Sequence, residues 1–295
     1  MIGIWAKQLR IHQWVKNLLV LIPALASFQL LNSTLWEPLV LAFVSLSAVA
    51  SAVYIFNDVV DAPNDRQHAT KKNRPVAAGN VSVRLALVVG VLLLILGVAL
   101  ASLAGLPFLT AVLIYLGATF AYTFFLKQVV LVDCLTLAGL YTIRVVAGAV
   151  VTGIALSFWL LAFSIFFFAS LAWVKRYAEL ETLKTAGKSA AKGRGYSVTD
   201  QPLILALGVM SAFIAVLIFA LYIDSDAIKI QYAVPQIAWL AIPMLMYLIG
   251  RIWFKANRGQ MNEDPILFVL RDVPSLVSIA SVGIALLVAH LGWSL

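Results

Sequence analysis

Long apolar segments separated by shorter polar ones dominate the chain. A helix that crosses the hydrocarbon core of a bilayer needs about 20 mainly apolar residues. Nine segments come close to this pattern: 17–32, 37–57, 84–104, 107–126, 129–151, 155–175, 203–223, 234–254 and 273–292. Residues 1–16 mix apolar and basic positions, which is typical of an interfacial helix. We therefore expect an all-α integral membrane protein with nine transmembrane helices, forming a single domain over 1–295.

Composition agrees with this class of protein. Of the 295 residues, 63% are hydrophobic and only 12% are charged, whereas a soluble domain carries about 25% charged residues. The mean hydropathy is +0.99. The single cysteine, Cys134, lies in an apolar segment. It excludes an intrachain disulfide and a cysteine metal cluster.

The charge is distributed unevenly between the two sides of the predicted bundle. The formal net charge is +8. If the N-terminus is inside, 19 of the 21 Lys and Arg residues fall on the inside, and only Lys229 falls outside, with Arg144 within a span. This is the positive-inside pattern, so the excess charge indicates topology and not nucleic-acid binding. We expect a multi-pass protein of the plasma (inner) membrane with a cytosolic N-terminus and an external C-terminus.

Three longer polar segments then lie on the cytosolic side, where we expect a polar cavity that holds the active site. They are residues 58–83, 176–202 and 255–272. Within the second, residues 184–200 are rich in Gly, Ala, Ser and Lys, which predicts a mobile loop. The connections expected outside are short, apart from 224–233.

The densest polar run extends from Asn57 to Gly79. Asp58, Asp61 and Asp65 are three and four residues apart, a spacing that places them on one helix face. Three carboxylates this close repel each other unless a cation lies between them. Mg²⁺ suits such oxygen ligands and usually adds substrate phosphate oxygens. The aspartates therefore predict a Mg²⁺ site.

Basic residues follow these aspartates and could bind phosphate: Arg66, Lys71, Lys72 and Arg74. Acidic residues followed by basic residues at a membrane boundary indicate a site for a Mg²⁺-bound diphosphate. The alternative is a solvated loop that obeys the positive-inside rule. That alternative explains the basic residues but not the aspartates at helical spacing.

Polar residues near other span ends extend the candidate site: Gln13, Lys16, Asn17, Asn57, Tyr122 and Lys127. Lys16 is either a topology signal or, with Asn17, faces the mouth of the cavity. Lys127 either reaches a phosphate or is a lysine whose amine extends to the interface.

Arg144 is the only basic residue within a predicted span. Burying an unpaired guanidinium is costly, so Arg144 should face the bundle interior and an anionic partner. That partner is either a ligand or Asp133, which lies three turns earlier on the same face and about 16 Å away along the axis.

Two more groups of charged residues border the last spans. One is Lys175, Arg176, Tyr177 and Glu179 after the sixth span, and the other is Arg271 with Asp264 and Asp272 before the ninth. The second group either binds a phosphate or seals one loop to another.

The pattern N-D-x-x-D-x-x-x-D, ending in RPVAAG, resembles the first signature of the UbiA superfamily of intramembrane prenyltransferases. The nine predicted spans are also similar to that family. The resemblance implies that Asp58, Asp61 and Asp65 hold Mg²⁺ on a diphosphate. It also implies that Tyr122 and Lys127 border the site.

The segment after the sixth span departs from the commonest family pattern. Most members carry a second aspartate-rich motif there, whereas this chain has KRYAEL. Two adjacent cations in place of carboxylates suit a second phosphorylated molecule better than a second metal ion. Three further motifs occur elsewhere in the chain: RxHQWVKN, YxIRxxAG and EDPxxFxLRD. Together with KRYAEL, they resemble the pattern of the decaprenyl-phosphate phosphoribosyltransferase branch of the superfamily.

That branch implies Mg²⁺-dependent transfer of the 5-phosphoribosyl group from phosphoribosyl pyrophosphate (PRPP) to a polyprenyl (decaprenyl) phosphate. Pyrophosphate is released, and the product supplies arabinose for the cell envelope. The implied partners are PRPP, the lipid phosphate and the bilayer, with no nucleic acid, and a homo-oligomer is left open. One alternative is a UbiA-type enzyme that attaches a prenyl chain to an aromatic acceptor, which the missing second motif opposes. The other is a polar-solute transporter, which would need polar residues through the depth of the spans.

Overall fold

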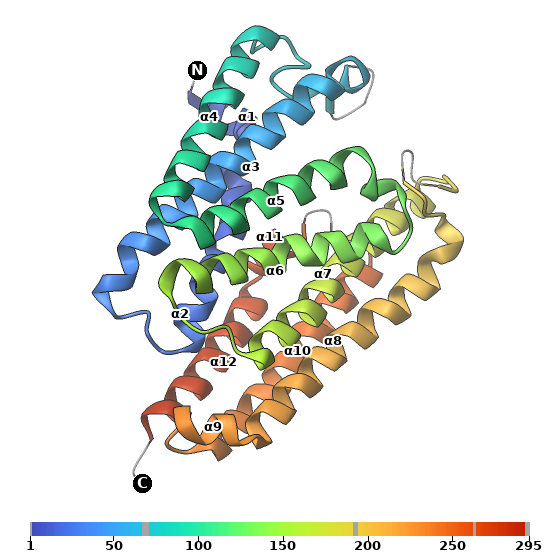
Figure 1. The fold of residues 1–295 in the computed structure, drawn as a ribbon. Helices are drawn as coiled ribbons and strands as arrows, with labels where there is room; N and C mark the ends of the chain where they lie inside the picture. Colours follow the sequence, from blue (N-terminus) through green and yellow to red (C-terminus); the bar gives the residue numbers. More distant parts are fainter. Residues whose placement is uncertain (1, 67–70, 191–193, 262–263, 293–295) are drawn as a thin grey trace. The chain divides into compact units, whose positions relative to one another are not determined.

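The structure, a computed structural model, describes residues 2–66, 71–190, 194–261 and 264–292 and is helical almost throughout (Figure 1). The α-helices are α1 (Ile2–Gln8), α2 (Ile22–Ala26), α3 (Trp36–Asp65), α4 (Val83–Leu103), α5 (Leu106–Phe124), α6 (Val132–Thr152), α7 (Phe158–Thr185), α8 (Gln201–Asp224), α9 (Asp226–Gln231), α10 (Ala241–Asn257), α11 (Pro265–Val269) and α12 (Val273–Leu291). The 3₁₀ helices are η1 (Ile11–Leu21), η2 (Ser33–Leu35), η3 (Lys71–Asn73), η4 (Leu126–Gln128), η5 (Val198–Asp200) and η6 (Pro235–Leu240).

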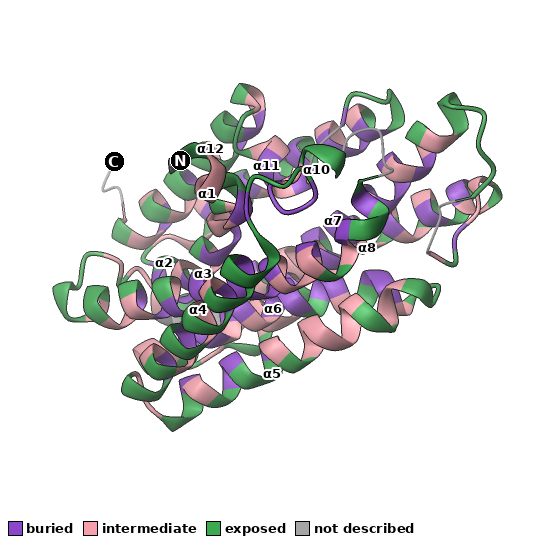
Figure 2. Cartoon of the chain, turned by 90° about the horizontal axis from the view of Figure 1, so that it is seen from above, coloured by how far each residue is buried: buried purple, intermediate pink, exposed green. Residues whose placement is uncertain are grey.

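Eight helical segments in this described part are long and apolar enough to cross a membrane. They are Ser33–Asp65, Val83–Leu103, Leu106–Phe124, Val132–Thr152, Phe158–Thr185, Val198–Asp224, Pro235–Asn257 and Val273–Leu291. Many large apolar residues on them are exposed, such as Leu92 and Ile95 at 60% each, and exposed positions follow much of α4 (Figure 2). Apolar side chains on an outer face are suited to contact with lipid. The prediction of an all-α integral membrane protein is confirmed.

The expected first span over 17–32 differs from what the structure shows. The apolar helical segment runs over Ile11–Ala26 and is shorter than the eight. It consists of η1 and α2, and the chain leaves it near Phe28, which has a φ of 56°. A 3₁₀ helix rises about 2.0 Å per residue, so η1 alone extends about 22 Å. The segment therefore reaches nearly as far as a longer α-helix would, but the count of nine spans is not confirmed.

The expected interfacial segment 1–16 is also divided. Helix α1 ends at Gln8, and Arg10 adopts a left-handed conformation with φ 51° and ψ 47°. A left-handed residue cannot continue a right-handed helix. Residues 11–16 therefore belong to η1 and not to an interfacial helix.

The chain divides into two compact units, which are described separately. Unit 1 comprises Met1–Phe124 and Ile143–Ala155, and unit 2 comprises Phe125–Thr142 and Leu156–Leu295. In unit 1, α3 packs along α4 and against η1. In unit 2, α7 packs along α8, and α10 packs along α12. Helix α6 contributes its first half to unit 2 and its second half to unit 1.

Small residues allow close backbone contacts within unit 1. A Cβ atom added to Gly148 of α6 would lie 2.0 Å from the carbonyl oxygen of Val20 in η1. Ser45 of α3 donates a hydrogen bond of 2.7 Å to the carbonyl oxygen of Gly97 in α4. Helices in membranes commonly pack through such small residues.

Replacing Gly148 by alanine is expected to lower the thermal unfolding temperature, because the new methyl group would overlap a backbone atom that cannot rotate away. Gly139→Ala is the matched control on the same helix, since nothing lies within 4 Å of a Cβ atom added there. Alanine favours a helix over glycine by about 1 kcal/mol, so the control should be neutral or stabilising. Equal unfolding temperatures for the two variants in the same detergent would contradict the close contact.

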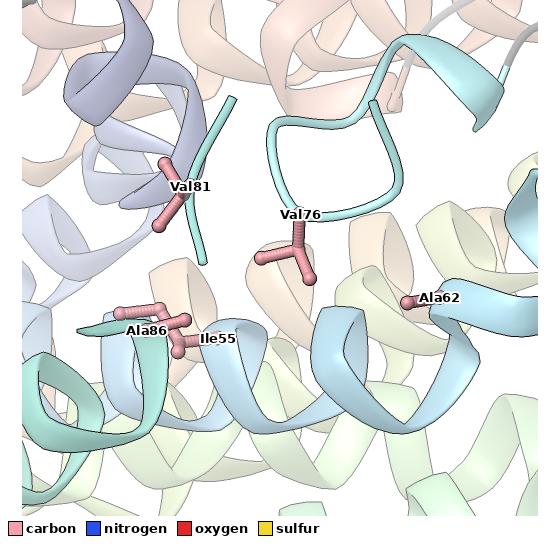
Figure 3. Packing of buried hydrophobic residues seen from close by; sticks show 5 residues of the cluster. All are labelled: Ile55, Ala62, Val76, Val81 and Ala86. Carbon is pink, nitrogen blue, oxygen red and sulfur yellow. The ribbon is translucent and has the colours of Figure 1, made fainter. Parts of the chain in front are cut away.

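The polar segment after α3 folds back onto that helix. Val76 and Val81 are buried with Ile55 and Ala62 of α3 and Ala86 of α4. Figure 3 shows Val76 pointing from its loop toward α3. This apolar contact fixes the loop that carries Arg74 over the acidic end of α3.

Candidate functional site

The three aspartates lie on one helix, as their spacing predicted. Helix α3 continues to Asp65, so the polar loop expected from residue 58 begins only after that residue. Asp58 and Asp65 are buried, and Asp61 is half-buried. The expected start of the loop at residue 58 was wrong, because a helix can continue through polar residues after it leaves the lipid.

Asp58 lies among cationic and amide groups in unit 1. Its Oδ1 atom is 2.6 Å from Nη2 of Arg10 and 3.2 Å from Nη1 of Arg74. Gln8 donates a hydrogen bond of 3.3 Å to Oδ2. The guanidinium of Arg10 also lies over the ring of Tyr54, 4.5 Å from its centroid. Two cations thus compensate a carboxylate that is only 2% exposed.

Asp58 and Asp65 converge on one positively charged atom. Nη1 of Arg74 is 3.2 Å from Oδ1 of Asp58 and 2.7 Å from Oδ2 of Asp65. The two carboxylates therefore share one cationic partner. Within α3, the two side chains are seven residues apart, about two turns.

The donor set around these carboxylates fits Mg²⁺. In the described part of the chain, the amide oxygens Gln8 Oε1 and Asn57 Oδ1 are buried without a hydrogen-bond partner. Carboxylate and amide oxygens are hard ligands suited to this ion. No group of three His, Cys, Asp or Glu side chains comes together as a metal site among the described residues. The participation of Asp61 therefore stays a prediction.

The basic residues of the following loop take different positions. Arg66 is exposed, and its Nε donates to the carbonyl oxygen of Ala77 at 3.3 Å, so it holds the loop. Lys71 is exposed in η3. His68 lies outside the described residues. Of this group, Arg74 is the residue that the structure brings to both aspartates.

Arg144 belongs to a buried polar network in unit 1. Its Nε donates to Oδ1 of Asn17 at 2.9 Å, and its Nη2 donates to the hydroxyl of Tyr115 at 2.8 Å. Asn17 in turn donates to Ser47 at 3.0 Å. Lys16, beside Asn17, is also buried, with 7% exposure. The sequence predicted that Arg144 faces inward and gave the cavity as one alternative for Lys16 and Asn17, but no pattern indicated Tyr115.

The other predicted residues of this group are spread over several helices. Gln13 is half-buried in η1. Asn57 donates a hydrogen bond of 3.3 Å to Thr123 near the end of α5, where the adjacent Tyr122 is half-buried. Lys127 is half-buried in η4 of unit 2.

Lys175 and Arg176 lie within α7 and not in a loop, because α7 continues to Thr185. Neighbouring residues of a helix point about 100° apart. Accordingly, Lys175 lies 3.5 Å from Asp264, whereas Arg176 pairs with Asp133 at 2.7 Å. The adjacent cations therefore do not form one anion receptor by adjacency alone. The start of the predicted loop 176–202 is corrected to residue 186.

Arg176 is the centre of a buried ion-pair network in unit 2. The side chains of Arg176 and Asp133 are both 0% exposed. Glu179, one turn later on α7, is a second partner of Arg176. Asp133, which the sequence analysis considered as a partner for Arg144, thus has Arg176 as its close cation.

Arg194 and Tyr196 complete this network, although no sequence pattern indicated them. Arg194 is 3.4 Å from Asp133 and 3.3 Å from Glu179. The buried hydroxyl of Tyr196 accepts a hydrogen bond of 2.9 Å from the backbone N–H of Leu131. Burial raises the pKa of Tyr196 well above its usual range. An aspartate within an apolar segment was the available signal, since such a carboxylate requires nearby cations.

Tyr177 and Asp264 fix the surroundings of Lys175. Tyr177 donates to Oδ1 of Asn257 at 2.6 Å and packs edge-on against Trp253. Asp264 accepts a hydrogen bond of 3.2 Å from Tyr141 and caps α11. Lys175 remains 36% exposed.

Asp272 seals the start of α12 to α10. Both of its oxygens accept hydrogen bonds from Arg251, at 2.6 and 2.7 Å, and it also accepts from the backbone N–H of Ser275. For Asp272, this is the sealing role considered in the sequence analysis. Arg271 is exposed in the turn before it.

The Arg251 pair holds the pKa of Asp272 well below its usual range. A carboxyl with a lowered folded-state pKa stabilises the protein above its unfolded-state pKa, about 3.9, and loses this effect as the pH falls through the folded-state value. Asp272→Asn should therefore lower the unfolding temperature by a constant amount from pH 7 to about pH 5, and the difference should shrink below about pH 4. A difference that grew on acidification would contradict the pair.

The fold and these sites define an all-α integral membrane protein with buried charged networks, and the comparisons identify its family. The model of the UbiA prenyltransferase family matches residues 20–271. The chain belongs to the UbiA prenyltransferase family.

Individual proteins agree with this assignment. The chain is 36% identical over 297 residues to the decaprenyl-phosphate phosphoribosyltransferase of Mycobacterium tuberculosis, covering 95% of this chain and 93% of that protein. It is also 36% identical to an uncharacterised protein, y4nM, of Sinorhizobium fredii, over 92% of this chain, and spans about half (53%) of that relative's length. Its fold matches a UbiA homolog from Archaeoglobus fulgidus, determined with GPP and Mg²⁺, with a TM-score of 0.69, 19% identity and coverage of 96% and 99%.

Proposed function

We propose that the protein transfers the 5-phosphoribosyl group of PRPP to a polyprenyl phosphate. The similarity to the Mycobacterium tuberculosis phosphoribosyltransferase over nearly the full length of both chains carries this proposal. The partly exposed Lys175 in α7 also supports it, because the resemblance to the family implies carboxylates for a second metal ion in this segment and the chain has a cation there instead. We further propose that the active site faces the cytosol and that the product feeds the synthesis of cell-envelope arabinose.

The reaction exchanges one bond at the ribose for another. A phosphate oxygen of the lipid forms a bond to the anomeric carbon of the ribose, and the bond from that carbon to the pyrophosphate oxygen breaks. Its electron pair leaves with the pyrophosphate. The lipid phosphate is already anionic near pH 7, so it needs positioning more than a general base.

In this proposal, Asp58 and Asp65, with Asp61, hold Mg²⁺. The ion, when bound, neutralises charge on the pyrophosphate. Arg74 is the cation held against both carboxylates, and we propose that it contacts a pyrophosphate oxygen when PRPP binds, with Lys71 as a further cation of unit 1. Lys127, in unit 2, stays a candidate phosphate ligand.

Lys175, which is partly exposed, is a candidate to hold either the 5-phosphate of PRPP or the lipid phosphate. Arg144 and Asn17 are candidates for the lipid phosphate within unit 1. Arg176 has two carboxylate partners and no exposed surface. We therefore assign to Arg176 the structural role of holding α7 in place.

The test uses purified protein in lipid nanodiscs with radiolabelled PRPP, a polyprenyl phosphate and MgCl₂. Labelled lipid should form, should disappear with EDTA and should return with excess Mg²⁺. Absence of labelled lipid, together with prenyl transfer from a polyprenyl diphosphate to an aromatic acceptor, would favour the ordinary prenyltransferase reaction.

A further inference from the structure

The end of α10 carries a groove that neither the aspartates nor the α7 network uses. Its volume is about 360 Å³, and its lining residues are Tyr247, Gly250, Arg251, Phe254, Lys255 and Arg258. Five of them belong to α10, and Arg258 is the residue that caps its C-terminal end, so the whole lining comes from unit 2. Binding pockets for small molecules typically begin at about 300 Å³.

The lining contains three basic side chains and two aromatic side chains. Positions 247, 251, 254 and 258 are four, three and four residues apart, so their side chains form one row along the helix. Tyr247 is 52% exposed and Phe254 is 63% exposed. Gly250 lies between Tyr247 and Phe254 in the sequence, and a Cβ atom added there would meet nothing within 4 Å. The space next to these two rings is therefore open.

The cations in this groove are held in place but are not all neutralised. Arg251 is fixed by its two hydrogen bonds to Asp272. Lys255 donates a hydrogen bond of 2.8 Å to the neutral Gln260, and the guanidinium of Arg258 lies 5.5 Å from the centroid of Phe254. Among the described residues, neither Lys255 nor Arg258 forms an ion pair. Within the described part of the chain, these two positive charges therefore have no carboxylate partner, and they line the groove with exposed aromatic rings.

The groove lies at the end of a membrane span, since α10 belongs to the segment Pro235–Asn257. The positive-inside rule accounts for basic residues at this end, and so does the favourable interaction of cations with a helix C-terminus. Neither effect accounts for the groove that Tyr247 and Phe254 line beside these basic residues. A ligand with an anionic head and an apolar tail fits both parts of the lining.

We propose that this groove binds the phosphate headgroup of an anionic phospholipid of the bilayer. Lys255 and Arg258 would contact the phosphate, and the exposed rings of Tyr247 and Phe254 would contact the glycerol and the first part of the acyl chains. Basic pockets between or beside transmembrane helices recognise such headgroups. The site is distinct from the residues assigned to the transfer reaction, so it does not depend on that proposal.

The test measures phosphatidylglycerol binding to the delipidated full-length protein by native mass spectrometry. The double variant Lys255→Gln/Arg258→Gln should bind about thirtyfold more weakly, because each basic side chain near an anionic lipid contributes a factor of about five. The matched control is Lys184→Gln/Lys188→Gln, which removes the same charge from two exposed residues, one in the last turn of α7 and one just after it. That control should bind like the unmodified protein.

Further arms distinguish the source of the phosphate. Phosphatidylcholine should bind more weakly than phosphatidylglycerol, and inorganic phosphate should not compete at similar concentrations. Equal weakening in both double variants, or in neither, would overturn the proposal. Stronger binding of a polyprenyl phosphate than of phosphatidylglycerol at this groove would also overturn it, because the occupant would then be the lipid substrate.

Discussion

Replacing Asp58 by asparagine is expected to reduce the transfer of phosphoribosyl groups by about a hundredfold or more, the usual cost of losing a charge that stabilises a transition state. Asp58 is the carboxylate that lies within 3.2 Å of both Arg10 and Arg74. Asparagine has nearly the same shape but no charge, so it cannot neutralise Mg²⁺ or these arginines. The measurement is the initial rate of labelled-lipid formation across a range of Mg²⁺ concentrations.

Asp65→Asn provides a graded comparison within the same site. In this variant the carboxylate of Asp58 would remain. We therefore expect the Mg²⁺ concentration at half-maximal rate to be higher than in the unmodified protein, and the loss of maximal rate to be smaller than in Asp58→Asn. Asp226→Asn is the control, because Asp226 is 95% exposed and pairs only with the nearby Lys229 among the described residues. A normal rate for Asp58→Asn in folded protein would rule out the proposed metal site. Folding is checked by size-exclusion chromatography and thermal unfolding.

Replacing Arg176 by glutamine is expected to lower the free energy of unfolding more than the Gly148→Ala or Asp272→Asn change does. The variant leaves Asp133 buried with much less positive charge beside it, and breaking one partner of a buried ion pair typically costs about 3–5 kcal/mol. Arg194, 3.4 Å from Asp133 and partly exposed, compensates only part of that charge. The measurement is the thermal unfolding temperature in detergent.

A double variant separates this structural role from substrate binding. Asp133→Asn/Arg176→Gln removes both charges and should recover part of the stability lost in Arg176→Gln, because no buried charge is left unpaired. Lys229→Gln, at the exposed pair, should leave the unfolding temperature unchanged. If Arg176→Gln unfolds normally but raises the KM for one phosphorylated substrate, Arg176 is an anion receptor and the structural assignment is wrong.

For buried charged residues, the sequence predicted which side chains face the interior but not which partners they meet. Arg144 was expected to face the interior because a guanidinium is costly in a bilayer, and it does so, with Asn17 and Tyr115 as partners. Its alternative partner Asp133 pairs instead with Arg176, which is 43 residues away in sequence. Cost of burial is a property of one residue, whereas the identity of a partner depends on which helices pack together.

The sequence by itself determined the class of protein, the long apolar helices and the placement of Asp58, Asp61 and Asp65 on one helix face. These features depend on composition and on the 3.6-residue period, which are local properties. Only the tertiary structure decided that Arg10 meets Asp58 across 48 residues and that Arg74 lies between two aspartates. It also decided that Lys175 and Arg176 point to different partners. Those contacts arise where separate segments fold together, and a one-dimensional pattern of polar and apolar residues does not contain that information.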